Sequence, residues 1–546
     1  MTTPILSGAV CSEHRLASQV GTEMLAAGGS AADAMIATVL AINTLCPYHS
    51  DLGGGGFAIV RSPAGEYQGL DFRQHAPAAV TMEFYQNGAS TSKGGAAVAV
   101  PGELRGLEQL HQQYGRLPWS KLFEPSIKFA EEGVPYTCRE CVPGGSDQIE
   151  GSFYQTDEMY APLFPDGKAL PPGAKYPRPE FARTLRLLAD RGADGFYEGE
   201  VAEALIKVVR ERGGLMSLDD LKNFQPRWID PIQARYRDYT LWTLPAPASG
   251  AIWLSAMGML SQLDRTEEGA VLGQHRVTEA LRLAFGQRTE LGDPAFVPGL
   301  QEKQASWISE EGSRRRSEMI SDERTFPPEY YMTPSTEIKY DSGTSNITTA
   351  DSSGLVISLT TTVGWNWGSK IMVPGYGFVL NNSMDDFSVQ GRPNGFGYEP
   401  TPANYVQGGK KPLSSSCPYI VEDSTGCVVL SGGAAGGSTI ISSNIQVARN
   451  VLDFGMSAAE ALRANRLHDQ IQPNVTYLER TSTTQGITVD GHSEELADGL
   501  REKGHVVEWV TAHRSTPCAM RFTSEGKWEA AGDPRKHDSG GSESYA

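Results

Sequence analysis

Residues 344–362 read Thr344-Ser-Asn-Ile-Thr-Thr-Ala-Asp351, Ser352-Ser-Gly354 and Leu355-Val-Ile-Ser-Leu-Thr-Thr-Thr362. The two longer stretches are rich in Thr, Ile, Val and Leu, which predicts two strands. The three residues between them predict a tight hairpin loop with its Gly in the left-handed position. In that register the first and last residues, both Thr, lie opposite one another with Cβ atoms about 4.5–5.5 Å apart. The sequence therefore predicts that two hydroxyl groups meet at the open end of the hairpin.

The peptide bond before Thr344 is the feature that favours a catalytic role for this threonine over a purely structural one. Opposed threonines alone are most often structural. The preceding residues 310–343 are polar and interrupted by Gly and Pro, which predicts an exposed connection ending at Gly343. If the Gly343–Thr344 bond breaks, Thr344 gains an α-amine that can serve as general base for its own hydroxyl. The sequence thus permits an N-terminal threonine nucleophile.

Three further segments carry residues suited to acyl transfer. Gly432-Gly-Ala-Ala-Gly-Gly437 lies between a predicted strand, 428–430, and a predicted helix, and it matches neither a P-loop nor GxGxxG. Its backbone N–H groups could stabilise an oxyanion. Arg73 suits bidentate contact with a carboxylate, and the Asp pair of Met384-Asp-Asp-Phe-Ser388 suits contact with an ammonium group. Each of these signals alone also fits a structural turn.

Composition disfavours several classes of protein. The 546 residues carry 47 Lys and Arg against 65 Asp and Glu, a formal charge of −18, which disfavours binding to a phosphate backbone. No apolar run approaches the roughly 18 residues that a membrane span needs. The N-terminus shows no secretory signal, so a cytoplasmic or other intracellular location is expected. The seven Cys, with Cys138 and Cys141 as an isolated CxxC, predict neither a disulfide framework nor a metal site, and no cofactor is expected.

The candidate segments belong to an ordered series of motifs that spans most of the chain. The series is Gly28–Asp33, Gly53–Gly56, Asp71–Pro77, Val98–Glu103, Gly343–Thr344, Asn381–Ser388, Pro412–Ser415, Gly433–Gly437 and Arg466–His468. It resembles the γ-glutamyltransferase family of N-terminal-nucleophile hydrolases. The resemblance implies an α/β (α+β) fold of four layers in the order αββα, formed by one domain with a large-subunit segment, 1–343, and a small-subunit segment, 344–546. Residues after about 535 are predicted to be a disordered tail.

The resemblance also implies an activity. Thr344 would attack the carbonyl of Gly343, cleave the chain, and then form an acyl-enzyme with a γ-glutamyl amide such as glutathione or a glutathione-derived conjugate. Water, an amino acid or a peptide would accept the acyl group, and the two fragments would remain together as a heterodimer. The implied site consists of Thr344 as nucleophile, Thr362 to orient it, Gly436 and Gly437 as oxyanion hole, Arg73, Ser414 and Ser415 for the α-carboxylate, and Asp386 for the α-amine.

Three positions depart from the family pattern. Asn346 stands where the family has His, Gly364 where a polar Asn commonly helps to bind substrate, and Ser383 where Glu or Gln precedes Met-Asp-Asp. Two lost polar contacts, each worth roughly 0.5–1.5 kcal/mol, would weaken the binding of glutathione. The nearby Trp365 and Trp367 favour a bulkier or more apolar substrate, although these changes fit altered packing equally well. Two alternatives therefore stay open: a same-fold acylase or specialised-metabolism enzyme, and an unprocessed, non-catalytic binding homologue.

Overall fold

A computed structural model describes most of the chain. The described residues are 6–135, 163, 168, 170–171, 173–332, 343–392, 400–484, 486–512 and 514–545. The pair Cys138 and Cys141, and residues 333–342 of the predicted connection, lie outside them.

Two antiparallel sheets form the centre of the molecule. The first has the spatial order β20 (Gly540–Tyr545), β1 (Leu6–Ser12), β9 (Gly343–Asp351), β10 (Val356–Gly364), β2 (Gly55–Arg61), β3 (Tyr67–Phe72) and β6 (Arg227–Ile229). The second has the order β19 (Trp528–Gly532), β18 (Thr516–Phe522), β12 (Val428–Ala435), β11 (Tyr419–Glu422), β8 (Tyr239–Thr243) and β7 (Ile232–Tyr236). Smaller sheets join β13 (Leu467–His468), β14 (Thr476–Arg480) and β17 (Val507–Thr511), then β15 (Ser482–Thr484) and β16 (Ile487–Val489), and then β4 (Val134–Pro135) and β5 (Lys175–Tyr176).

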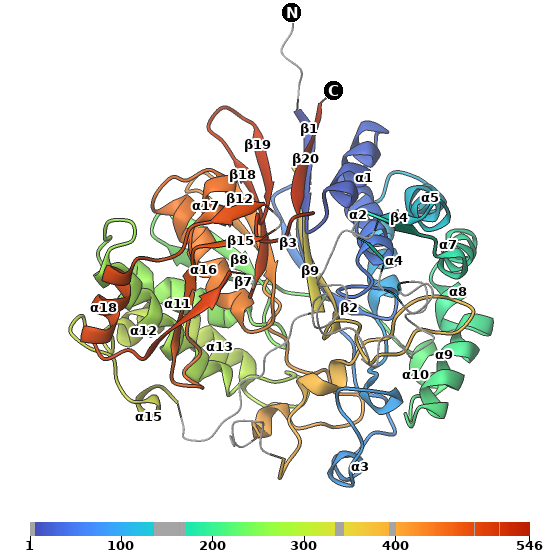
Figure 1. Cartoon of the computed structure of the whole chain (residues 1–546), viewed down its shortest axis with the longest axis horizontal. Helices are drawn as coiled ribbons and strands as arrows, with labels where there is room; N and C mark the ends of the chain where they lie inside the picture. The colour runs from blue at the N-terminus through green and yellow to red at the C-terminus, as the bar shows by residue number, and fades with distance from the viewer. Residues whose placement is uncertain are drawn as a thin grey trace, which may run out of the picture.

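Helices cover the outer faces of both sheets, and Figure 1 shows the two groups on opposite sides of the strands. The first group comprises α1 (Arg15–Ala26), α2 (Ala31–Leu45), α4 (Glu103–Tyr114), α5 (Glu124–Glu132), α7 (Pro179–Arg191), α8 (Asp194–Tyr197), α9 (Gly199–Glu211) and α10 (Leu218–Lys222). The second comprises α11 (Gly250–Ser261), α12 (Val271–Arg288), α13 (Leu300–Ile308), α14 (Glu310–Ser317), α16 (Thr439–Leu452), α17 (Ala458–Arg463) and α18 (Glu494–Glu502). The predicted αββα order of layers is confirmed.

Three hydrophobic clusters match these layers. One lies between the first helix group and the first sheet, and a second lies between the second sheet and its helices. A third, smaller cluster separates the two sheets and includes Phe57, Ile59, Ile420 and Met520. Burial of apolar surface at about 25 cal/mol per Å² is the main force that holds such layers together.

The predicted hairpin forms in the predicted register. Strand β9 pairs with β10 so that Thr344 lies opposite Thr362, and Gly354 takes a φ of 87° in the loop. The glycines at the start of β2 explain how the neighbouring strand fits: a Cβ on Gly56 would lie 1.9 Å from the carbonyl oxygen of Thr360. That Gly cluster therefore serves close backbone packing against the hairpin.

Local signals also place α2 as predicted. The side chain of Ser30 accepts from the backbone N–H of Asp33, and Asp33 returns the bond, which is a complete capping box. All side chains of α2 are buried, because the helix lies between the first sheet and other helices.

Three local predictions are wrong. The tail is ordered at residues 540–545, where β20 pairs with β1 and forms the edge of the first sheet, because strand pairing uses backbone groups that a polar sequence also possesses. Strand β12 continues through the predicted Gly-rich turn to Ala435, since β11 and β18 flank it on both sides. The predicted exposed connection contains the helices α14 and α15 (Pro328–Tyr331), and Ser309 caps the first of them.

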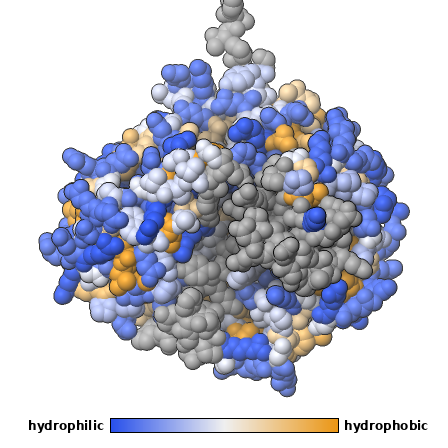
Figure 2. Space-filling view, viewed as in Figure 1, coloured by the Kyte–Doolittle hydropathy of each residue, from blue (hydrophilic) through white to orange (hydrophobic). Residues whose placement is uncertain are grey.

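The surface agrees with the acidic composition. On the face drawn in Figure 2, hydrophilic residues predominate among the described ones, and hydrophobic residues form small separate patches. Within the described part of the chain, no helix has the length and apolar character required to cross a bilayer.

Candidate functional site

Three polar groups at the open end of the β9–β10 hairpin are connected by consecutive hydrogen bonds. The hydroxyl of Thr344 donates to Oγ1 of Thr362 at 3.1 Å, and the hydroxyl of Thr362 donates to the carbonyl oxygen of Gly343 at 2.5 Å. The backbone N–H of Gly364 donates to the same Thr362 oxygen at 2.8 Å. Thr344 and Thr362 are each only 2% exposed. The structure therefore brings together the predicted nucleophile, its orienting partner and the carbonyl of the bond to be cleaved.

This arrangement has a clear chemical consequence. A hydroxyl that donates to a carbonyl oxygen withdraws electrons from the carbonyl carbon and stabilises negative charge that develops on the oxygen. The same Thr362 hydroxyl accepts from Thr344, so it also fixes the direction of the predicted nucleophile. Both hydrogen bonds involve Thr362 on the facing strand, so the register of the hairpin determines where the hydroxyl of Thr344 and the carbonyl of Gly343 lie.

Gly436 and Gly437 lie between the end of β12 and the start of α16. Their φ angles are 124° and 60°, values at which a side chain causes strain. A Cβ on Gly436 would also lie 2.4 Å from the carbonyl oxygen of Arg514. Strand β12 packs against β9, so both glycines lie at the carboxyl end of a strand on the sheet that faces Thr344. Their role as oxyanion hole stays a prediction.

Arg73 and Asp386 form a direct ion pair between Nη2 and Oδ2. Arg73 follows β3 and is 1% exposed, and Asp386 ends the short helix η6 (Ser383–Asp386). Asp71 holds this region in place, because its Oδ1 accepts from the N–H of Arg73 at 3.0 Å and its Oδ2 pairs with Lys411 at 2.6 Å. Two residues predicted to bind opposite charges of one substrate are thus adjacent.

The adjacent serines have different environments. Ser414 donates to Oγ of Ser416 at 2.9 Å, whereas Ser415 accepts from Nη2 of Arg288 at 2.8 Å. Burial lowers the pKa of Arg288 to about 10, although the nearby Asp386 acts in the opposite direction. Arg288 was missed by sequence reasoning, because a basic residue in the last turn of a helix is usual and no local pattern marks it. Together with Arg73, it places a second guanidinium beside the predicted carboxylate site.

The departures from the family pattern have structural explanations at two positions. Asn346 is 1% exposed and donates to the carbonyl of Leu359 at 3.1 Å and to Oγ1 of Thr360 at 3.2 Å, so it links the hairpin strands. A Cβ on Gly364 would lie 2.1 Å from Oδ1 of Asn382, which accepts from the N–H of Trp365 at 2.8 Å. The carboxamide of Asn382 therefore occupies the space that a side chain at 364 would need.

Ser383 leaves a polar atom without a partner. The residue is fully buried, and its hydroxyl makes no hydrogen bond to the described residues. A buried unpaired hydroxyl costs about 1–3 kcal/mol, so a ligand that bonds to it gains that amount. Ser383 stays a candidate for substrate contact.

The two tryptophans are not equivalent. Trp367 is 2% exposed and packs against Tyr48 with ring centroids 6.1 Å apart, which is a core contact. Trp365 is 44% exposed, and its backbone lies where a Cβ on Gly343 would fall, 2.5 Å from the Trp365 carbonyl oxygen. Trp365 is therefore the exposed tryptophan beside the predicted cleavage site.

Comparisons with known proteins agree with this geometry. The sequence profile of the family described as Gamma-glutamyltranspeptidase matches residues 17–542. A glutathione hydrolase proenzyme of Arthroderma benhamiae is 40% identical over 550 residues, which cover 98% of this chain and 92% of the relative.

Solved structures extend the comparison to the fold. A cephalosporin acylase from Bacillus halodurans superposes with a TM-score of 0.83 at 25% identity, over 99% of this chain and 96% of that one. A gamma-glutamyltranspeptidase of Helicobacter pylori gives a TM-score of 0.54 at 28% identity, over 60% of this chain and 95% of that one. With a paired threonine at the start of β9 and a family match across nearly the whole sequence, this chain belongs to the gamma-glutamyltranspeptidase family.

Proposed function

We propose that this chain is an autoprocessing γ-glutamyl hydrolase or transferase that acts on glutathione or a glutathione-derived conjugate. One observation carries the proposal: the hydroxyl of Thr362 bridges the hydroxyl of Thr344 and the carbonyl oxygen of Gly343. The name of the Arthroderma benhamiae relative, a glutathione hydrolase proenzyme, supports both the substrate and the processing step.

The first reaction is cleavage of the chain itself. Oγ of Thr344 attacks the carbonyl carbon of Gly343, a C–O bond forms, and the C–N bond to Thr344 breaks. The hydroxyl proton is transferred to the departing nitrogen, which becomes the free α-amine. Water then hydrolyses the ester, which leaves a carboxylate on Gly343 and restores the hydroxyl of Thr344. The 60% coverage by the Helicobacter pylori chain supports a separate large fragment, since residues 1–343 form a similar share of this sequence.

The second reaction uses the amine that the first one creates. The α-amine of Thr344 takes the proton of its own hydroxyl while the oxygen attacks a γ-glutamyl amide, and the protonated amine then supplies the proton of the leaving group. Water, an amino acid or a peptide attacks the resulting ester and releases the acyl group. The two fragments of the chain act together as a heterodimer.

The ion pair of Arg73 with Asp386 suggests how the substrate is recognised. A glutamyl group carries an α-carboxylate and an α-ammonium group, so it can take the place of the ion pair: the carboxylate binds Arg73 and the ammonium binds Asp386. A donor without the ammonium group would separate the pair and leave Asp386 uncompensated, which is costly at a partly buried site. The geometry therefore favours a zwitterionic donor.

Intact mass measurement of the purified chain, with N-terminal sequencing, tests the proposal. Cleavage would yield fragments of about 37 and 22 kDa, in proportion to their lengths within the 59.0 kDa chain, and a new N-terminus at Thr344. A single stable chain of full mass that no γ-glutamyl-mimicking inhibitor labels at Thr344 would contradict it and favour a non-catalytic binding homologue.

A second candidate function is an acylase for another substrate. Ser383 and Gly364 offer fewer polar contacts than the family pattern predicts, and the similar Bacillus halodurans structure is a cephalosporin acylase. Turnover of γ-glutamyl-p-nitroanilide compared with glutaryl-p-nitroanilide separates the two functions, because only the first donor has an α-amine. Hydrolysis of the glutaryl donor alone would replace the γ-glutamyl proposal with the acylase.

A further inference from the structure

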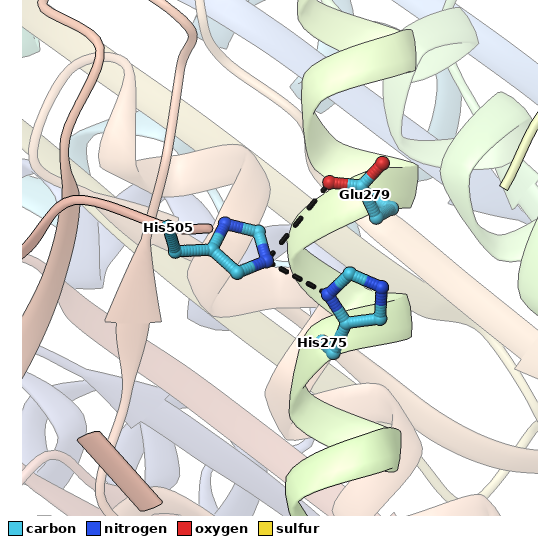
Figure 3. A group of neighbouring side chains, drawn as sticks. All are labelled: His275, Glu279 and His505. Atoms are coloured by element: carbon cyan, nitrogen blue, oxygen red, sulfur yellow. Dashed lines mark hydrogen bonds and ion pairs between the residues drawn. The ribbon is translucent and has the colours of Figure 1, made fainter. Parts of the chain in front are cut away.

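A buried group of three metal-binding side chains lies far along the sequence from the hairpin. His275 and Glu279 are one helical turn apart on α12, and His505 lies between α18 and β17. One ligand atom of each lies within 4.8 Å of the others, and all three side chains are buried. Figure 3 shows a ring nitrogen of His275 and a carboxylate oxygen of Glu279 each directed towards the same ring nitrogen of His505.

The hydrogen bonds of His275 determine which of its nitrogens has a free lone pair. Nε2 lies 2.6 Å from the carbonyl oxygen of Ser321. A carbonyl oxygen only accepts, so Nε2 carries the hydrogen and donates it. Nδ1 of the neutral ring therefore presents a lone pair, and it points at His505.

The same reasoning applies to His505. Its Nδ1 lies 3.4 Å from Oγ1 of Thr476, and Thr476 donates its own hydrogen to Oδ2 of Asp469 at 2.8 Å. The Thr476 oxygen can therefore only accept from His505, so Nδ1 carries the hydrogen and Nε2 has the lone pair. The two facing nitrogens, Nδ1 of His275 and Nε2 of His505, then lie 2.7 Å apart, and a metal ion between them would accept a lone pair from each.

Glu279 supplies the third donor. Its Oε2 accepts from the hydroxyl of Tyr331 at 2.6 Å, whereas its Oε1 accepts no hydrogen bond from the described residues. Oε1 lies 4.0 Å from Nε2 of His505. Arg282, which lies nearby, pairs with Asp469 at 3.0 Å and so is occupied by another carboxylate. A fully buried carboxylate oxygen without a partner is costly, and a metal ion would satisfy it.

We propose that His275, Glu279 and His505 bind a divalent transition metal ion, with zinc as the best match to two imidazole nitrogens and one carboxylate oxygen. A tetrahedral ion with bonds of about 2.0–2.1 Å places its ligand atoms roughly 3.3 Å apart. The observed separations of 2.7 and 4.0 Å lie on either side of that value, and every pair of ligand atoms lies within 4.8 Å. A shared proton could join the two rings, but it would leave Oε1 of Glu279 without a partner.

The surroundings orient the two histidine ligands. Ser321 and Thr476 hold the outer nitrogens of the two rings, which is how metal-bound histidines are usually oriented. The two ligands on α12 belong to residues 1–343, and His505 belongs to residues 344–546. The ion would therefore connect the two segments of the chain at a second place, remote in sequence from the nucleophile, and stabilise the folded state.

Metal analysis of the full-length protein tests this site. The protein is produced without a histidine tag in zinc-supplemented medium, and its metal content is measured by inductively coupled plasma mass spectrometry. We expect about one zinc per chain. X-ray absorption at the zinc edge is expected to show imidazole scattering and N/O ligands at about 2.0–2.1 Å. This measurement needs no variant and therefore does not depend on how a variant folds.

Variants and a chelator complete the experiment. Glu279→Gln and His505→Asn should each lower zinc content at least about tenfold. His468→Gln is the matched control, because His468 is also buried but both of its ring nitrogens have partners at 2.9 Å. In the unaltered protein, a chelator should lower the melting temperature and zinc should restore it. Less than about 0.1 zinc per chain together with a melting temperature insensitive to zinc and chelator, or a bound zinc without imidazole ligands, would overturn the proposal.

Discussion

Two successive cross-strand residue pairs of the β9–β10 hairpin, called rungs below, face opposite sides of the first sheet. Thr344 and Thr362, the nucleophile pair, face the second sheet, and their hydroxyls bond to each other and to a backbone carbonyl. Ser345 and Thr361, the anchor pair, are also opposite one another, but successive strand residues point to opposite faces. Each anchor hydroxyl bonds to a buried carboxyl group. The predicted reactive hydroxyls and the hydroxyls that attach the hairpin therefore lie on opposite faces of the sheet, at neighbouring residues.

The carboxyl groups that these hydroxyls contact, Glu13 and Glu103, are the two anchor acids, and they differ in charge. Ser345 donates to Glu13, whose other oxygen contacts Lys536 and His49. Burial alone would raise the pKa of Glu13, but Lys536 and His49 outweigh burial and lower it to about 2. Thr361 contacts Glu103 at 2.7 Å, and within the described chain no cationic side chain forms an ion pair with Glu103. Burial raises the pKa of Glu103 to about 8. At neutral pH Glu13 is therefore a carboxylate and Glu103 a neutral acid.

Removal of the nucleophile should have the largest effect. Thr344→Ala leaves the hairpin but removes the attacking oxygen, so we expect an uncleaved chain of 59.0 kDa. Turnover of γ-glutamyl-p-nitroanilide should fall by more than about 10³-fold. Intact mass and initial rates measure the two effects. Thr344→Ser keeps a hydroxyl and is the matched control, in which cleavage should persist. Cleavage at the same bond in the Ala variant would assign the reaction to another residue.

The next prediction compares the two rungs directly through Thr362→Val and Thr361→Val. Both substitutions preserve shape and remove one buried hydroxyl, so each should cost about 1–3 kcal/mol of stability. Only Thr362→Val removes the donor to the Gly343 carbonyl, and it should slow chain cleavage by about 10²-fold. Timed gel analysis of freshly purified protein measures the rate, and melting temperature measures stability. Equal cleavage rates in the two variants would remove the distinction between the rungs.

The difference between the rungs also shows where sequence reasoning succeeds. The register of the hairpin follows from a three-residue loop and strand composition, and the cap of α2 follows from Ser30 and Asp33, because each signal is local. The approach of Arg73 to Asp386 was expected only through the family resemblance, since 313 residues separate them.

Other features left no local signal. Glu13 and Lys536 lie 523 residues apart, and either residue in its own segment reads as an ordinary surface charge. The polar residues of β20 read as a tail because only the free edge of β1 makes them a strand. His275 and Glu279 have helical spacing, yet the third residue of their cluster is supplied by a distant loop. Contacts between segments far apart in the sequence determine these features, and local residue spacing does not predict them.

Removal of the charged anchor acid, Glu13, should have the third-largest effect. Glu13→Gln leaves the buried Lys536 without its carboxylate, and breaking a buried pair in this way costs about 3–5 kcal/mol. The melting temperature should fall clearly, and the double variant Glu13→Gln with Lys536→Met should recover part of the loss. Glu318→Gln, at an exposed pair with Arg314, is the control and should change stability by less than about 0.5 kcal/mol. A fall no larger than that of the control would show that the charged anchor is dispensable.

The smallest expected effect, and the most specific one, is the difference between Glu13 and Glu103 in how stability depends on pH. For Glu13 the folded pKa is lowered from 4.5 to about 2, so its contribution is present above pH 4.5 and is lost as pH falls towards 2. For Glu103 the folded pKa is raised from 4.5 to about 8, so its contribution is complete below pH 4.5 and is lost as pH rises through 8.

Glu103→Gln should therefore flatten the stability profile between pH 5 and 8, by up to about 1.4 kcal/mol per pH unit. Glutamine resembles the neutral acid, so the variant should match the unaltered chain near pH 5 and exceed it near pH 8. Melting temperatures at intervals across this range measure the effect. Glu13→Gln is the matched variant, whose profile should differ in slope from that of the unaltered chain only below pH 4.5. Parallel profiles for Glu103→Gln and the unaltered chain would mean that Glu103 is ionised when folded, and the two anchors would then be alike in charge. Profiles that coincide near pH 5 and diverge towards pH 8 would establish that the hairpin is held by one charged and one neutral carboxyl group on the face opposite Thr344.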